Sequence, residues 1–155
     1  MDHDFTPLTQ HISYTALIFL LGVIIGVVLH IFVPWEFTRH TVRAIGLGWV
    51  FLIVAPALLF WGDESRATCY HHDEPGHVCK ALGHGPYAHT RHPKYVAFMF
   101  LFVGLGLILN SIVMFIICAA LFLLFTFYII PREEKILMEE FSEYEEYRSK
   151  VSMWL

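Results

Sequence analysis

Long apolar segments alternate with short or polar connections along the chain. Residues 12–33 and 44–61 are almost wholly apolar, and each is close to the roughly 20 residues that a helix needs to cross a bilayer. Residues 95–130 carry no charge. As one helix this run would extend about 54 Å, far beyond a hydrocarbon core of ~30 Å, so it must fold back. We therefore expect four membrane-spanning helices.

The fold-back point is the most polar pair within the last apolar run, Asn110-Ser111. We expect a tight helical hairpin there, with a third span over 95–109 and a fourth over 112–130. Pro131 is then expected to bend the chain out of the membrane. Apolar residues recur at helical spacing over 132–150, which predicts a C-terminal amphipathic helix with a solvated acidic face.

Composition agrees with a membrane protein. The chain of 155 residues is 57% hydrophobic and 15% charged, whereas a soluble domain carries roughly 25% charged residues. The formal charge of −4 shows no basic face, which makes nucleic acid an unexpected partner. We predict an all-α membrane protein with a single domain over 1–155 and membrane lipids as neighbours.

The basic residues predict the sidedness of the membrane protein. Four spans would place both termini and the polar loop 62–92 on one side. That side collects eight of the ten lysines and arginines: Arg66, Lys80, Arg91, Lys94, Arg132, Lys135, Arg148 and Lys150. The other side holds only Arg39 and Arg43. Because basic residues favour the inside, we expect the loop and the termini to be cytoplasmic.

Residues 85–95 lie at the start of the expected third span. Pro93 suits the first position of a helix, which makes His92 the expected N-cap. Arg91 and His92 then lie at the positive end of the helix dipole, where free N–H groups favour an anion. The tyrosines Tyr87 and Tyr95 lie on either side of these cations. The pattern predicts a polar pocket at a membrane surface.

Two motifs in this order resemble the isoprenylcysteine carboxyl methyltransferase family, which groups with the integral-membrane phospholipid methyltransferases. The first motif is Gly85-Pro86-Tyr87 followed by Arg91-His92-Pro93-x-Tyr95. The second is Arg132-Glu133-Glu134 followed by Phe141, Tyr144, Tyr147 and Val151. The resemblance covers about the C-terminal half of the chain, and the short chain is similar to the compact prokaryotic members, which would place it in the cytoplasmic membrane.

The resemblance implies a methyltransferase that uses S-adenosylmethionine, with the segments 85–95 and 131–151 forming the cofactor site. Arg and His suit the carboxylate of the donor, acidic side chains suit its ribose diol, and aromatic faces suit its sulfonium. Gly104 and Gly106 would allow a close approach to the backbone of the third span. The expected cofactor contacts are Tyr87, Arg91, His92, Tyr95, Gly104, Gly106, Glu133 and Glu134, and the expected catalytic residues are Arg91, His92 and His89.

The acceptor and the base stay open at this point. Lipophilic and small acceptors, whether carboxylates, thiols or amines, all suit a site at a membrane surface. A carboxylate is already a nucleophile, whereas a thiol or an amine needs a base such as His89 or His92. The chain departs from the family at Ala97 and Ser142, where glycines are common. Its shorter spacing from Phe141 weakens Tyr144 and Tyr147 as site candidates.

A second group of candidate ligands lies in the loop: Cys69, His71, His72, Asp73, His77, Cys79 and His84. Their spacing matches no standard zinc finger, so we expect no metal site there. A metal-handling membrane protein nevertheless stays an alternative function. A sterol-reductase-like enzyme with a nicotinamide cofactor is another, although such a chain would be larger and would carry a basic cluster for phosphate.

Overall fold

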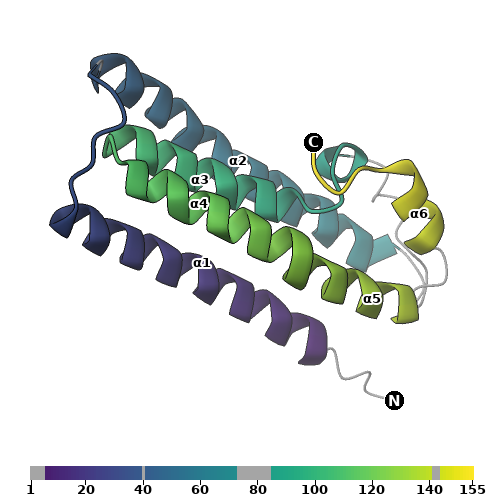
Figure 1. Cartoon of the computed structure of the whole chain (residues 1–155). Coiled ribbons are helices and arrows are strands. Elements are labelled where there is room, and N and C mark those ends of the chain that lie inside the picture. Colours follow the sequence, from purple (N-terminus) through teal and green to yellow (C-terminus); the bar gives the residue numbers. More distant parts are fainter. Residues whose placement is uncertain (1–5, 40, 73–84, 141–143) are drawn as a thin grey trace.

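The fold is a bundle of helices (Figure 1). The computed structural model describes residues 6–39, 41–72, 85–140 and 144–155, and no strand occurs within them. The elements are α1 (Thr6–Phe32), α2 (Thr41–His72), the short 3₁₀ helix η2 (Gly85–Ala88), α3 (Pro93–Ile108), α4 (Ile112–Leu124), the π-helical turn η3 (Phe125–Ile129), α5 (Ile130–Glu140) and α6 (Tyr144–Lys150). The predicted all-α membrane fold is confirmed.

The long helices are apolar on their outer faces. The segments Tyr14–Phe32, Thr41–Ser65 and Ile112–Glu139 are long and apolar enough to cross a membrane, whereas Pro93–Ile108 is apolar but shorter. Large apolar side chains such as Phe32, Val42, Phe60 and Phe127 lie exposed on them. An outer surface of this kind suits lipid rather than water. The count of four spans stays a prediction, because α3 is short.

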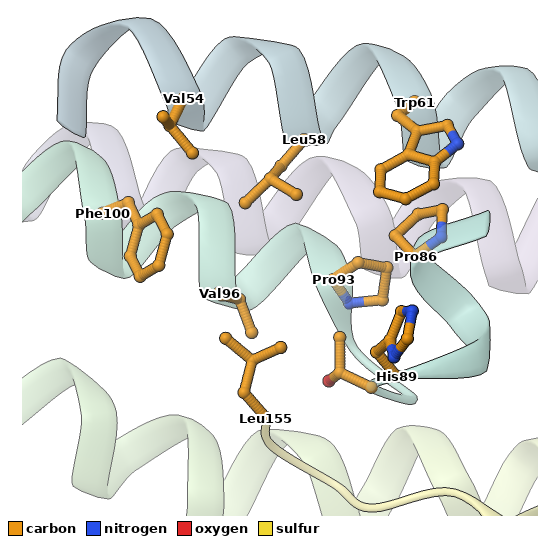
Figure 2. A pocket seen from close by; sticks show the side chains of 10 residues that line it. Val54, Leu58, Trp61, Pro86, His89, Pro93, Val96, Phe100 and Leu155 are labelled. Carbon is orange, nitrogen blue, oxygen red and sulfur yellow. The ribbon is translucent and has the colours of Figure 1, made fainter. Parts of the chain in front are cut away.

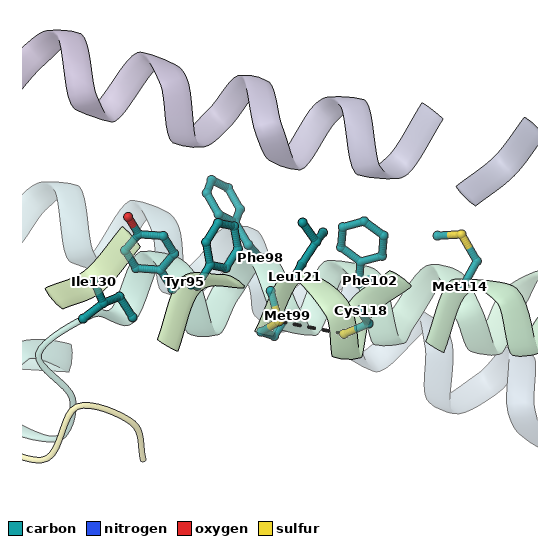
Figure 3. Close-up of a cluster of buried hydrophobic side chains, with 9 residues drawn as sticks. Tyr95, Phe98, Met99, Phe102, Met114, Cys118, Leu121 and Ile130 are labelled. Atoms are coloured by element: carbon teal, nitrogen blue, oxygen red, sulfur yellow. Dashed lines mark hydrogen bonds between the residues drawn. The ribbon is translucent and has the colours of Figure 1, made fainter. Parts of the chain in front are cut away.

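The core lies where α1 covers the hairpin of α3 and α4. Figure 3 shows Tyr95, Phe98, Phe102, Leu121 and Met114 pointing from the hairpin toward α1. Phe19 of α1 stacks on Phe98 with ring centroids 4.3 Å apart. The small residues that permit this approach are Gly22 and Gly26, since a Cβ at either would collide with Leu121 or Met114.

The hairpin turn lies at Asn110-Ser111, as predicted. Asn110 has φ 51°, which is a left-handed conformation that asparagine tolerates. Ser111 is the N-cap of α4, and its side chain accepts a hydrogen bond from the N–H of Met114. At the same end, backbone bonds join the turn to the connection between α1 and α2, including the bond from the Ile112 N–H to the Trp35 carbonyl (3.0 Å).

The bend out of the membrane that was expected at Pro131 is wrong, because the helical segment Ile112–Glu139 continues through this proline. The chain passes from α4 through η3 into α5, and α5 continues in the general direction of α4 (Figure 1). Within η3 the Ile130 N–H bonds to the Phe125 carbonyl, five residues back. A π-helical turn widens the helix immediately before the proline, which lacks the N–H for an ordinary α-helical bond.

The single helix expected over 132–150 is also wrong. In a straight helix Arg148 would lie ~21 Å along the axis from Glu134. Instead the Arg148 Nε atom lies 3.2 Å from Glu134 Oε2, which requires α6 to fold back over α5. The beginning of α1, η2, α5, α6 and the C-terminus consequently gather at one end of the bundle, opposite the hairpin turn (Figure 1).

Candidate functional site

Glu134 on α5 is the centre of a buried polar cluster, and only 2% of its surface is exposed. Its Oε1 atom lies 2.9 Å from Arg91 Nη1 and 3.1 Å from His92 Nε2. Its Oε2 atom lies 3.2 Å from Arg148 Nε on α6. Three segments that are distant in sequence therefore converge on one carboxylate. A buried charge of this kind needs such partners, because desolvation alone would strongly disfavour it.

Arg91 is a buried cation that retains unused donors. Its side chain is 9% exposed, yet within the described part of the chain its Nε makes no hydrogen bond. Its Nη1 atom reaches Glu134 at ion-pair distance but outside hydrogen-bond geometry. Buried donors are normally satisfied, so a guanidinium with free N–H groups is suited to a further acceptor such as the carboxylate of a ligand.

Tyr95 connects the carboxylate of Glu133 to the core. Its hydroxyl donates a hydrogen bond of 2.6 Å to Glu133 Oε1 and lies 3.3 Å from the Thr15 hydroxyl of α1. Tyr95 is buried, whereas Glu133 is only partly buried. Among the residues that the structure describes, Glu133 makes no ion pair, whereas Glu134 makes three, so Glu133 is the more available hydrogen-bond acceptor of the two.

The start of α3 is built as the sequence predicted, with His92 as N-cap and Pro93 in the first turn. The His92 side chain makes no capping bond, and the ring faces Glu134 instead. The Thr90 hydroxyl accepts a hydrogen bond from the His92 N–H (3.2 Å) and donates one to the Met153 carbonyl (2.9 Å). The N-terminal end of α3 is thereby joined to the C-terminal residues.

The C-terminal segment closes one side of the cluster. The Tyr147 hydroxyl donates a hydrogen bond to the Tyr87 carbonyl (2.8 Å), and the Arg91 N–H donates one to the Ser152 carbonyl (2.9 Å). Tyr144 is buried beside Glu134. Burial first, and then the charge of Glu134, raise the pKa of Tyr144 to about 12, so its hydroxyl stays protonated at neutral pH.

The structure thus brings together six predicted site residues: Tyr87, Arg91, His92, Tyr95, Glu133 and Glu134. It adds Arg148 and Thr15, which sequence reasoning missed. Arg148 directly follows Tyr147 of the second motif, and that adjacency was the available signal. The position of Thr15 had no local signal, because its contact with Tyr95 is made across the bundle.

Three predicted residues lie away from this cluster. Gly104 faces α2, where a Cβ would lie 3.0 Å from the Gly48 carbonyl oxygen, and Gly106 faces Met114 and Phe115 of α4. Both glycines are covered by protein atoms, so helix packing accounts for them. His89 lines a cavity whose lining includes neither Arg91 nor Glu134.

That cavity is apolar and small, about 220 Å³. Figure 2 shows Trp61, Leu58 and Val54 of α2 facing Pro93, Val96 and Phe100 of α3. The rest of the lining is Pro86, His89, Thr90 and Leu155. Sites that enclose a whole drug-sized ligand usually measure about 300–1,000 Å³. The cavity therefore fits part of an apolar molecule rather than a complete nucleoside cofactor.

Among the residues whose placement the structure describes, no group of three or more His, Cys, Asp or Glu side chains is arranged to hold a metal ion. The candidate metal ligands of the sequence, from Cys69 to His84, have side chains outside that described part. The predicted absence of a metal site in this loop consequently stays a prediction.

Comparison with known proteins gives one match. The family model described as phospholipid methyltransferase matches residues 65–144, just over half of the chain. The matched region includes η2, α3, α4, η3 and α5, and so contains every member of the polar cluster except Thr15 and the C-terminal segment after Tyr144. Searches of curated proteins and of solved structures found no match.

Proposed function

This chain belongs to the phospholipid methyltransferase family, and we propose that it transfers a methyl group from S-adenosylmethionine to an acceptor at a membrane surface. The donor supplies an electrophilic methyl group on a sulfonium. The enzyme then has to hold donor and acceptor in line and exclude water. The residues of the polar cluster have the chemistry to hold the donor.

The unused donors of Arg91 are the observation that carries the proposal. The donor has one carboxylate, and Arg91 offers buried N–H groups that no described residue satisfies. A carboxylate bound there would form charge-assisted hydrogen bonds, which are about twice as strong as neutral ones. The N-terminal end of α3 lies next to Arg91 and adds a favourable dipole.

The remaining parts of the donor also find suitable groups. Glu133 is the better acceptor for the ribose diol, because Glu134 is already held by three positively charged or polar side chains. Tyr95, Tyr144 and Tyr147 surround the cluster with aromatic rings, and aromatic faces favour a sulfonium. These roles extend the expectation drawn from the two sequence motifs.

The apolar cavity between α2 and α3 supports a lipophilic acceptor over a small polar one. Its lining is apolar except for His89, Thr90 and Trp61, and its α2 residues Val54 and Trp61 are also exposed on the surface of the bundle. An apolar tail held there would present its polar head near His89. His89 would then serve as base for a thiol or an amine, and a carboxylate would need none.

We further propose that the polar cluster faces the cytoplasm. Arg91, Lys94, Arg132, Lys135, Arg148 and Lys150 all belong to this end of the bundle, and Arg39 and Arg43 belong to the end with the hairpin turn. The excess of basic residues favours the cytoplasmic side for the cluster. A soluble donor would reach the cluster from that side.

The test is a calorimetric titration of the full chain in detergent with S-adenosylhomocysteine, the product form of the donor. We expect saturable binding that Glu133→Gln weakens about tenfold, because a neutral amide is a weaker acceptor for the diol. Glu146→Gln is the matched control, since Glu146 is exposed and pairs only with Lys150 among the described residues. It should bind like the wild type.

Metal analysis of the same preparation distinguishes the alternatives. Binding of S-adenosylhomocysteine without stoichiometric metal supports the methyltransferase. Stoichiometric zinc or copper with no affinity for S-adenosylhomocysteine would overturn the proposal in favour of a metal-handling protein. Binding of a nicotinamide dinucleotide with no affinity for S-adenosylhomocysteine would overturn the proposal in favour of a reductase.

A further inference from the structure

Arg148 approaches the site from α6, which lies within the expected cofactor segment 131–151 but supplied none of the expected site residues. The short helix α6 is held against the site by Tyr144, which is buried, and by Tyr147, whose hydroxyl bonds to the Tyr87 carbonyl. These anchors place Arg148 Nε 3.2 Å from Glu134 Oε2. The side chain of Arg148 is 44% exposed, so it reaches the buried carboxylate from the solvent side.

The two oxygen atoms of Glu134 are divided between two arginines. Arg91 and His92 share Oε1, and Arg148 takes Oε2. An isolated arginine and carboxylate prefer a bidentate pair in which two N–H groups meet both oxygens. Arg148 occupies Oε2, Arg91 approaches Oε1 through Nη1, and Arg91 Nε is left without a bond in the described structure.

The charge balance around Glu134 also favours an anionic ligand beside Arg91. Two guanidinium groups, those of Arg91 and Arg148, share the single carboxylate of Glu134. Together these three side chains carry one net positive charge, with Arg91 and Glu134 buried and Arg148 44% exposed. An anionic ligand beside Arg91 would balance that charge.

We infer that Arg148 is a positioning residue: by holding Oε2 of Glu134, it keeps the N–H groups of Arg91 available for the carboxylate of the methyl donor. The inference rests on the proposed function for the identity of that carboxylate. Arg148 itself does not contact the donor. It acts through Glu134 and Arg91, so α6 becomes part of the donor site although it lies mostly beyond the family match.

The test compares the affinity of variants of the full chain for S-adenosylhomocysteine, with the melting temperature measured in parallel. Arg148→Met should weaken binding about tenfold, because Arg91 can then close on both oxygens of Glu134. Arg148→Lys keeps a charge near Oε2 and should recover about half of that loss on a logarithmic scale. Lys150→Met is the matched control on the same helix, where the lysine pairs with Glu146, and should bind within twofold of the wild type.

A double-mutant cycle with Glu134→Gln separates positioning from a general role in folding. If Arg148 acts through the carboxylate, adding Arg148→Met to Glu134→Gln should change affinity less than twofold. A full additional tenfold loss would overturn the inference, since Arg148 would then act through the donor itself or through the docking of α6. If Arg148→Met fails to fold, Arg148→Lys takes its place in the cycle.

The outcomes for the wild type and the variant are distinguishable. If the wild type binds S-adenosylhomocysteine and Arg148→Met binds it with the same affinity, the positioning role is overturned and the proposed function stands. A wild-type chain that does not bind S-adenosylhomocysteine overturns the proposed function, and the inference about Arg148 with it.

Discussion

The two ends of the bundle each contain a buried polar network, but the networks differ in charge and in completeness. At the hairpin end, the Asn110 side chain accepts a hydrogen bond from the Thr38 N–H (2.9 Å) and donates one to the Thr38 carbonyl (2.8 Å). At the opposite end, Glu134 has charged partners, while Arg91 has N–H groups that form no hydrogen bond within the described ranges. One network is neutral and closed, and the other is charged and open.

We interpret the first network as structural and the second as the proposed donor site. A satisfied neutral network fixes the relative position of the segments it joins. The Asn110 network does this for the connection between α1 and α2. An incompletely satisfied charged network costs stability that only a ligand restores, which is typical of functional sites. Substitutions at the two ends should therefore separate stability from binding.

The largest effect is expected for Glu134→Ala, which leaves Arg91 and Arg148 without their buried partner. Removing one member of a buried ion pair typically costs about 3–5 kcal/mol of unfolding free energy. Binding of S-adenosylhomocysteine should also fall by at least about 100-fold. Denaturant unfolding and calorimetry in detergent measure both. A variant that keeps wild-type affinity would contradict the assignment of this end as the donor site.

At the closed end, Asn110→Ala should affect stability alone. It removes two hydrogen bonds to Thr38 and strains a left-handed backbone, which together cost about 2–3 kcal/mol. Asn110→Gly keeps the backbone relaxed and should cost less. Affinity for S-adenosylhomocysteine should be unchanged in both. A loss of affinity larger than threefold would show that the two ends are coupled.

Gly104→Ala tests whether this glycine serves packing or the donor. The added Cβ would lie 3.0 Å from the Gly48 carbonyl oxygen and the Leu52 side chain of α2. Overpacking of this kind typically costs about 1–3 kcal/mol, and we expect about 1–2 kcal/mol here. The folded molecules should bind S-adenosylhomocysteine with normal affinity. A calorimetric titration measures this affinity, and the number of sites gives the fraction of molecules that can bind. A normal melting temperature with weakened binding would restore the cofactor role.

The smallest effect is expected for Tyr144→Phe, which should change only how the melting temperature depends on pH above about 10. Burial and the neighbouring Glu134 raise its pKa to about 12, above the unfolded value of about 10. The folded state therefore holds the proton more tightly, and its contribution to stability is lost as the pH rises from about 10 to about 12. Melting temperatures should fall less steeply over this range in Tyr144→Phe than in the wild type. The exposed Tyr14 offers a control substitution, Tyr14→Phe, and equal slopes in all three proteins would refute the expectation.

Sequence reasoning reached the features that depend on local chemistry and on length. The run over 95–130 is too long for one span, and the polar pair Asn110-Ser111 marks where it reverses. A hairpin returns the chain to the end that it left, so Arg91 and Glu134 were expected to share one end. Pro93 likewise marked the start of α3.

Contacts across the bundle were not predictable in the same way. The segment 141–143 holds neither glycine nor proline, so nothing in the sequence signalled that α6 folds back to bring Arg148 to Glu134. Gly104 and Gly106 matched a backbone-approach pattern, but the pattern does not say whether a helix or a ligand makes the approach. His89 lies only two residues from Arg91, yet it lines the apolar cavity between α2 and α3, whose lining does not include Arg91.

The widened turn η3 also sets the angular register of everything that follows it. The bond from the Ile130 N–H to the Phe125 carbonyl spans five residues, so this turn takes up one residue more than an ordinary α-helical turn. If the same residues closed as an α-helix, every later residue would be rotated by about 100° around the helix axis, and Glu133 and Glu134 would swing away from Tyr95 and Arg91. The length of this turn, as much as the identity of its side chains, determines whether the two carboxylates face the site.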